Sequence, residues 1–133
     1  MITRSGLIRM LAAALLAVPL SLLALSPSPA LATATACAGN AGSSGSTCIT
    51  VNGSGLYVDS VKATLTRNHL GSGCYQVTIT FGSTYSIFAT RCGDGRTRTY
   101  GPDPVYMSFP NGTKACATWS YNPSIRPCVT IHS

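Results

Sequence analysis

The sequence predicts an all-β fold, a small disulfide-stabilised antiparallel β-sandwich of immunoglobulin-like type. Charged residues make up only 9% of the 133 residues, against roughly a quarter in average soluble domains. Such a surface must consist largely of Ser, Thr, Asn, Gly and Tyr, which suit strands and turns better than solvated helices. Short runs that alternate apolar and polar residues are separated by turn residues, and six cysteines are available to brace a small core.

Residues 1–32 are predicted to be a signal peptide that is removed. Arg4 and Arg9 precede an apolar run over 10–25, and the segment closes on the small-residue pattern Ala-Leu-Ala at 30–32. Cleavage two or four residues further on fits the same pattern. The run is short and interrupted by a proline, so it is a poor membrane span. We expect a secreted, extracellular protein with no stable membrane association after cleavage.

The mature chain is expected to form one domain. Removal of residues 1–32 leaves 133 − 32 = 101 residues, and removal of the two leader arginines lowers the formal charge from +6 to 6 − 2 = +4. That mildly basic charge indicates solubility rather than a nucleic-acid partner. Residues 33–47 hold nothing larger than Asn or Cys and are expected to be a flexible arm that could add to a sheet edge. The β-sandwich domain is expected over 48–133.

The first half of this domain alternates cleanly. The first strand opens at 48–51, and residues 61–66 place three apolar side chains on one face. After a turn at 68–73, residues 74–81 give the clearest period of two in the chain, with large apolar residues on one face and polar residues on the other. A Gly-Ser-Thr turn at 82–84 then reverses the chain.

The second half contains more turn residues. A strand is expected at 85–92, and the Asp94-Gly95 pair predicts a tight hairpin turn into a further strand at 96–100. Pro102 and Pro104 are expected to interrupt pairing. The remaining strands are expected at 105–109, 114–121 and 128–132, which makes seven or eight in all.

The six cysteines predict three disulfides rather than a metal site. Their spacings are all much longer than the C-x-x-C pattern typical of zinc ligands. Fifteen connectivities are possible, and the sequence does not choose among them. We favour nearest-neighbour pairing, because the members of each such pair bracket one hairpin or loop. The favoured pairs are Cys37 with Cys48, Cys74 with Cys92, and Cys116 with Cys128.

Catalytic groups are scarce in the mature sequence. The two histidines lie in a turn and next to the chain end, and two of the three aspartates are explained by a turn and by flanking prolines. No G-x-S-x-G motif is present. The sequence therefore predicts a protein that is not an enzyme and that holds no cofactor.

Two groups of residues are candidates for binding a partner. Guanidinium groups and tyrosines are enriched where proteins grip one another, and Arg96 and Arg98 are expected to share a strand face. A solvated sheet edge protected by charge is the alternative. The first candidate group is Arg91, Arg96, Arg98 and Tyr100, and the second is the start of the arm, Thr33, Ala34, Thr35 and Ala36.

Three stretches of the chain resemble a known group of proteins. They read "CITVNGSGLYVDSVKATL", "FPNGTKACATWSY" and "RPCVTIHS", and they resemble small secreted actinobacterial β-sandwich proteins that include the adaptor subunit of Streptomyces umbrella toxin particles. The resemblance covers 48–133 and contains no catalytic signature. It implies a non-enzymatic linker between a lectin subunit that binds cell surfaces and a large toxin polypeptide, with 33–47 as a strand lent to a partner.

The expected function is therefore that of a protein-binding adaptor in an antibacterial toxin complex. One alternative is an inhibitor of an extracellular hydrolase that presents the segment 91–100. Another is a small cationic antimicrobial protein, which a charge of +4 supports only weakly.

Overall fold

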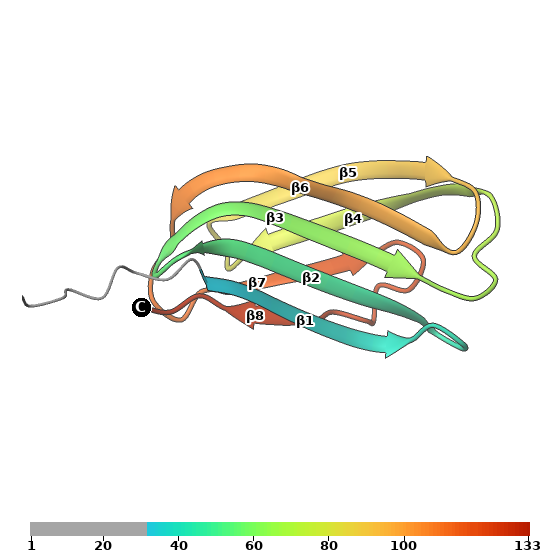
Figure 1. The fold of residues 1–133 in the computed structure, drawn as a ribbon, viewed down its shortest axis with the longest axis horizontal. Helices are drawn as coiled ribbons and strands as arrows, with labels where there is room; N and C mark the ends of the chain where they lie inside the picture. Colours follow the sequence, from blue (N-terminus) through green and yellow to red (C-terminus); the bar gives the residue numbers. More distant parts are fainter. Residues whose placement is uncertain (1–31) are drawn as a thin grey trace, which may run out of the picture.

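The computed structural model of the protein describes residues 32–133, and these form two antiparallel sheets packed face to face (Figure 1). One sheet has the strand order β1-β2-β3-β6 and the other β5-β4-β7-β8. The all-β sandwich predicted from the sequence is confirmed, whereas the predicted signal peptide lies outside the described residues except for Ala32. The strands are β1 (Ala32–Asn40), β2 (Gly45–Ser54), β3 (Tyr57–Thr66), β4 (Gly73–Phe81), β5 (Tyr85–Gly93), β6 (Thr97–Ser108), β7 (Lys114–Trp119) and β8 (Cys128–Thr130).

The connections interlock the two sheets. The chain crosses from one sheet to the other after β3, after β5 and after β6. As a result β3 pairs with β6 in one sheet, while the strands that follow them, β4 and β7, pair in the other. This is the Greek-key arrangement of immunoglobulin-like sandwiches.

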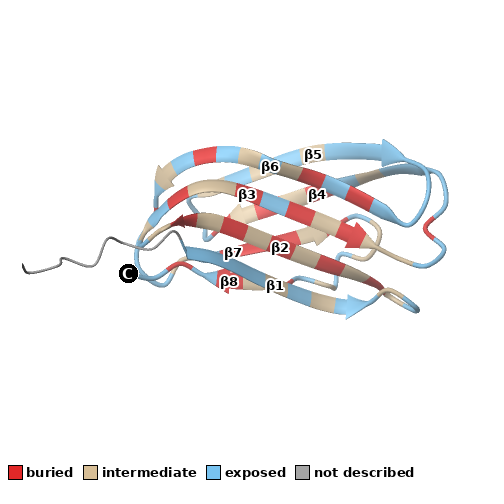
Figure 2. Cartoon of the chain, in the orientation of Figure 1, coloured by how far each residue is buried: buried red, intermediate tan, exposed pale blue. Residues whose placement is uncertain are grey.

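The core lies between the sheets and takes alternate residues from each strand (Figure 2). Phe81 stacks on Phe109 with ring centroids 4.6 Å apart. Trp119 is 1% exposed, as expected for the single tryptophan of a small β domain, and its indole N–H has no hydrogen-bond partner among the described residues. The inward side chains of the three central strands are those that the alternation predicted: Val61, Ala63 and Leu65, then Val77, Ile79 and Phe81, then Ala115, Ala117 and Trp119.

The N-terminal segment corrects one expectation. Residues 33–47 are not a flexible arm outside the domain: they form β1, a turn and the start of β2. All nine residues of β1 pair with β2 in one unbroken antiparallel register. Their short side chains bury little area, but the ladder to β2 satisfies the backbone and the Cys37–Cys48 disulfide fastens the strand. The domain therefore begins at β1 rather than at residue 48.

Between β5 and the end of β6 the structure differs from two further expectations. Asp94 and Gly95 do not form a tight hairpin, because β5 and β6 belong to different sheets and the chain crosses between them here. Pro102 and Pro104 do interrupt the pairing locally, because the ladder to β3 skips from Tyr100 to Asp103 and shifts again after Pro104. They do not divide the segment into two strands, since β6 continues from Thr97 to Ser108. The outer strand of a sheet tolerates proline, since one side of its ladder is unused, and the pairing of β3 with β6 contains two register shifts that absorb the irregularity.

The favoured disulfide pairing is confirmed for all three bonds. Each bond joins residues that lie directly opposite one another on neighbouring strands, β1 to β2, β4 to β5 and β7 to β8. In each strand the cysteine alternates with the inward residues, so the bonds lie on the outer faces of the sheets. The two sheets are therefore held together by apolar packing, while each disulfide fixes the register of one strand pair.

Candidate protein-binding surfaces

Arg98 holds the structure together rather than facing a partner. It is 2% exposed, and its guanidinium donates to the carbonyls of Gly71 at 2.7 Å, Gly73 at 3.1 Å and Gly93. Its charge also lies 5.7 Å from the ring centre of Tyr75. These contacts tie the segment between β3 and β4 to the end of β5. The expectation that Arg96 and Arg98 share an accessible strand face is wrong, because Arg96 precedes β6 in an exposed loop.

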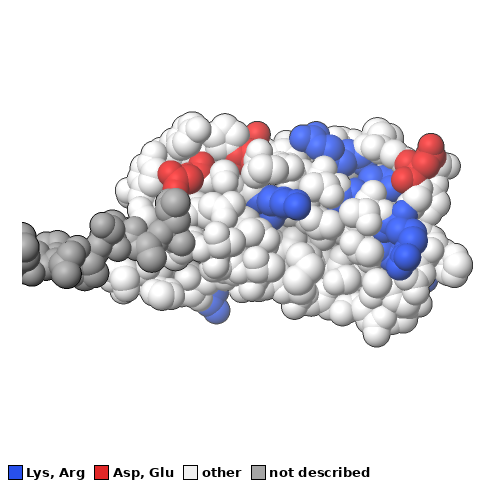
Figure 3. Space-filling model, viewed as in Figure 1, with Lys and Arg blue, Asp and Glu red and all other residues white. Residues whose placement is uncertain are grey.

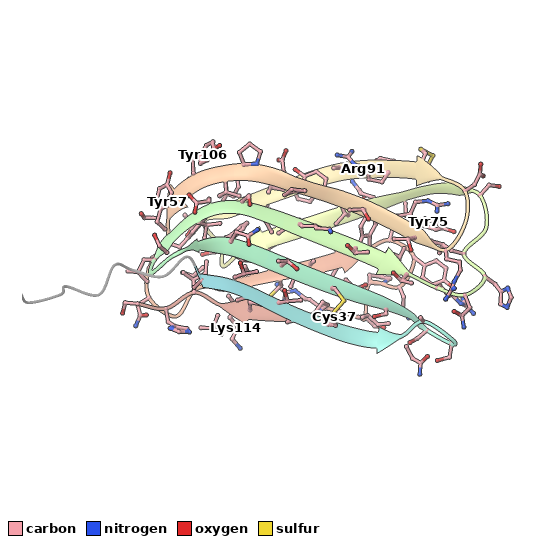
Figure 4. All side chains as sticks on the ribbon, viewed as in Figure 1. Cys37, Tyr57, Tyr75, Arg91, Tyr106 and Lys114 are labelled. Atoms are coloured by element: carbon pink, nitrogen blue, oxygen red, sulfur yellow. A yellow bond between two sulfur atoms is a disulfide. The ribbon has the colours of Figure 1, made fainter. Side chains whose placement is uncertain are left out.

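Tyr100 is also buried. Of the other three residues in its candidate group, only Arg91 lies over its ring. The phenol donates a 2.5 Å hydrogen bond to the Asp103 carboxylate. The Arg91 guanidinium lies 4.8 Å from the ring centre and donates to the carbonyl of Thr90 at 3.0 Å. Of the four residues predicted to form one patch, only Arg91 and Arg96 are accessible, and Figure 4 shows Arg91 on the β5 side of the molecule.

The environment of Tyr100 predicts a loss of stability in alkali. Its pKa is raised from 10.0 to about 12, first because burial disfavours the phenolate, and then because the Asp103 carboxylate accepts a hydrogen bond from the protonated phenol and repels the negative charge of the phenolate. Between pH 10 and 12 the unfolded chain loses this proton while the folded chain keeps it, so the free energy of unfolding falls. Below pH 10 the contribution of Tyr100 to the free energy of unfolding does not change with pH.

We expect this fall to reach about 2 kcal/mol. Urea unfolding followed by Trp119 fluorescence at increasing pH measures it, and Tyr100→Phe is the control because it lacks the titrating phenol. The variant should lose less stability than the wild type over this range. Parallel pH profiles for the two proteins would show that the phenol is not responsible.

Four loops meet at one end of the sandwich, which we call the arginine end. They are linked to one another: Arg67 N–H donates to the Arg96 carbonyl at 2.8 Å, Asn68 N–H to the Ala41 carbonyl at 2.8 Å, and the Arg96 guanidinium to the Asn68 side chain at 2.5 Å. Arg67 also lies 5.3 Å from the ring centre of Tyr121. The loops that form the arginine end are 41–44, 67–72, 94–96 and 120–127.

The arginine end is basic and preorganised. Its loops carry Arg67 and Arg96 against the single carboxylate of Asp94, whereas the Arg126 guanidinium points away from this end and donates to the Thr80 hydroxyl at 3.1 Å. On the face shown in Figure 3 most Lys and Arg atoms lie over this half of the molecule. Because the loops are already linked by hydrogen bonds, they lose little conformational entropy when a partner binds. This surface fits an acidic patch on another protein.

An apolar groove lies at the opposite end, beside the start of β1. The empty space over this groove is about 410 Å³, a figure that includes solvent in front of the surface. The lining is mostly apolar. The residues that line this apolar groove are Ala32, Ala34, Val51, Gly53, Gly55, Tyr57, Val58, Val129, Thr130, Ile131 and His132.

Exposed aromatic side chains occur near this groove and were not singled out from the sequence. Tyr57 is 38% exposed and Tyr106 is 68% exposed, and both lie at the end of the molecule where the described chain starts (Figure 4). Phe88 is also exposed, on the outer face of β5. No motif marks these residues. Tyr57 and Phe88 are members of strands in which only the topology decides which face is covered, and Tyr106 lies in the irregular part of β6, with φ 49°.

The four candidate residues of the arm all lie in β1 but face two directions. The Thr33 hydroxyl donates to the Asn52 side chain at 2.7 Å and the Thr35 hydroxyl lies 3.0 Å from that of Thr50, so both threonines belong to the outer face. Ala34 and Ala36 alternate with them and face inward, and Ala34 lines the apolar groove.

Within residues 32–133, no cluster of three or more His, Cys, Asp or Glu side chains is arranged to hold a metal ion. His69 and His132 are both exposed, at opposite ends of the molecule. In the same part of the chain there is no helix with the length and apolar character needed to cross a bilayer.

Comparison of the chain with models of protein families, with curated proteins and with solved structures finds no match. The protein is therefore described by its fold and by the chemistry of its surfaces. This is a small β-sandwich, braced by three disulfides, with two chemically different accessible ends. Three disulfides in a domain of this size are consistent with an extracellular or secreted protein.

Proposed function

We propose that this protein is a secreted, non-enzymatic adaptor that binds two other proteins through the two ends of its sandwich. The observation that carries the proposal is the separation of the arginine end from the apolar groove. One surface is basic and built from hydrogen-bonded loops, whereas the other is apolar and built from strand ends and the C-terminus. Partners bound at opposite ends would not compete for the same residues.

Two of the three stretches that carry the resemblance to toxin adaptors meet at the apolar groove. Val51, Gly53 and Gly55 of the first stretch line it, and so do residues 129–132 of the last. This convergence supports the groove as the site of one adaptor partner. By that resemblance the partners are a lectin subunit and a large toxin polypeptide of an antibacterial complex. No nucleic acid, metal or cofactor enters the proposal.

Two mechanisms raised by the sequence lose support. A flexible arm that leaves the domain to lend its strand to a partner does not fit β1, because one edge of β1 is paired along its whole length with β2 and the two strands are cross-linked. The hypothesis that 91–100 is the loop of an inhibitor also loses support, because most of this segment lies in strands and only 94–96 is a connecting loop. We therefore place partner binding on the preformed ends of the domain.

The test is capture of partners by the tagged, oxidised protein from the culture supernatant in which it is secreted. We expect two co-purifying chains. Arg96→Glu reverses a charge at the arginine end, and His132→Glu places a charge at the apolar groove; each should reduce capture of one chain at least about tenfold and leave the other unchanged. Thr99→Glu, an exposed change on the outer face of β6, is the matched control and should retain both.

A protein that elutes alone under several growth conditions would contradict the proposal. So would the loss of both chains together from either variant, because that result would place both partners on one surface.

A further inference from the structure

The outward edge of β1 is an unused hydrogen-bonding edge. β1 is the outermost strand of its sheet and pairs only with β2. The Cα atoms of Cys37 and Cys48 are 4.1 Å apart, the short spacing of opposed residues that do not exchange hydrogen bonds. The N–H and C=O of Cys37 therefore point away from β2. Because the register is unbroken, the same groups of Thr33 and Thr35 point outward too.

The other outward edges of the described sheets are blunted. β6 carries Pro102 and Pro104, together with a left-handed residue, Tyr106, at φ 49°. On β5 the Arg91 side chain donates a hydrogen bond to the carbonyl of Thr90, so this acceptor is no longer free. β8 is only three residues long. β1 has nine residues and neither proline nor charge, so it lacks the devices by which proteins prevent edge pairing.

We propose that β1 pairs with the β1 strand of a second copy of this chain, antiparallel and about a two-fold axis at Thr35. Two identical edges bring identical charges together, so an edge that pairs with itself must be neutral, as this one is. The outward backbone groups in the extended part of the strand are those of Thr33, Thr35 and Cys37, because Gly39 leaves the extended conformation at φ 86°. The middle one of the three is Thr35, which fixes the register.

In this register every outward backbone group finds a partner. Thr35 lies opposite Thr35 of the second copy, and Thr33 lies opposite Cys37 of the second copy. Each of these opposed pairs exchanges two hydrogen bonds. On the inner face Ala34 lies opposite Ala36 of the second copy, so only methyl groups meet where the two sandwiches approach most closely. On the outer face Thr35 meets Thr35 of the second copy, a favourable cross-strand pair, and Thr33 lies opposite Cys37.

The arrangement makes the dimer bivalent. β1 runs from the groove end towards the arginine end (Figure 1), so an antiparallel pair sends the two arginine ends in opposite directions and leaves both uncovered. Because the one other long edge of this sheet, β6, is blunted, the contact closes with two copies instead of extending into a fibre. A bivalent adaptor would hold a partner with repeated sites more tightly than a monomer does.

Sedimentation equilibrium of the oxidised, secreted protein from about 1 µM to about 1 mM tests the proposal. We expect a reversible monomer–dimer equilibrium. Thr35→Lys places two ammonium groups opposite each other across the axis and should raise the dimer dissociation constant about tenfold, less so at high salt. Thr99→Lys makes the same change on the outer face of the sheet far from β1 and should leave the constant unchanged.

Hydrogen exchange of the wild type gives a second readout that does not depend on a variant. Dimerisation should slow exchange at the amides of Thr35 and Cys37, whereas the amides of Ala34 and Ala36 are already bonded to β2 and should not change. A monomeric mass across the whole concentration range would overturn the proposal. A dimer that Thr35→Lys and Thr99→Lys leave equally intact would overturn it too, because the contact would then lie elsewhere. Neither result bears on whether the two ends bind other proteins.

Discussion

Replacement of Arg98 by alanine should lower the free energy of unfolding by about 3 kcal/mol, the largest effect of any single charged side chain in the domain. The guanidinium satisfies the carbonyls of Gly71, Gly73 and Gly93, and its stem fills space beside Tyr75. Without it, three carbonyls lose a charged donor and the chain between β3 and β4 loses its attachment to β5. Urea unfolding followed by Trp119 fluorescence measures the change.

Two further variants define the cause. Arg98→Lys keeps the charge but replaces a planar fork with a point charge that cannot reach three separated carbonyls, so it should recover only part of the loss. Arg96→Ala removes an exposed arginine two residues away and should change stability by no more than about 0.5 kcal/mol. Equal stability of the Arg98→Ala and Arg96→Ala variants would mean that the buried guanidinium is not a structural link.

Reduction of the three disulfides should unfold the domain under conditions in which the oxidised protein is folded. The bonds close loops with sequence separations of 11, 18 and 12 residues. Each is worth about 3 kcal/mol in the chain-entropy model, so together they contribute about 9 kcal/mol. That is comparable to the whole stability of a small domain, about 5–15 kcal/mol. Trp119 fluorescence and far-ultraviolet circular dichroism would report the loss of the core and of the strands.

The three bonds should differ in importance. β1 supplies only alanines to the inner face, so a Cys37→Ser, Cys48→Ser double variant should loosen β1 and leave the core folded. A Cys116→Ser, Cys128→Ser variant should cost more, because β7 carries Trp119 into the core. A fully reduced chain that unfolds at the same urea concentration as the oxidised chain would contradict the importance given to the disulfides.

Period-two alternation was enough to predict most of the strands and their inward faces. In 74–81 large apolar residues alternate with polar ones, in 114–121 alanine and tryptophan do so, and the structure buries the expected side of both segments. The Cys74–Cys92 pair followed from the same strand assignment, since cysteines that bracket a hairpin fall opposite one another. The Cys37–Cys48 pair did not, because it was predicted as a staple between a flexible arm and the domain. β1 was missed as part of the domain because alanine and threonine alternate without a strong contrast in hydrophobicity.

The binding surfaces were harder to predict, because the topology creates them. Nothing local distinguishes the buried Arg98 from the exposed Arg96: the difference arises because glycine carbonyls from two distant loops converge on one of them. The apolar groove likewise joins β1, β2 and the C-terminal residues, which are far apart in the sequence. The prolines of β6 were expected to separate two strands, but proline is tolerated there because the topology places β6 at the edge of its sheet.

Simultaneous binding at the two ends is the central claim, and one measurement tests it most directly. The first captured partner is immobilised, saturated with the oxidised protein, and then exposed to the second partner, with binding followed in real time. Independent surfaces predict that the second partner binds the saturated complex as tightly as it binds the free protein. Competition between the two partners, or a failure of either to bind the free protein, would contradict the account.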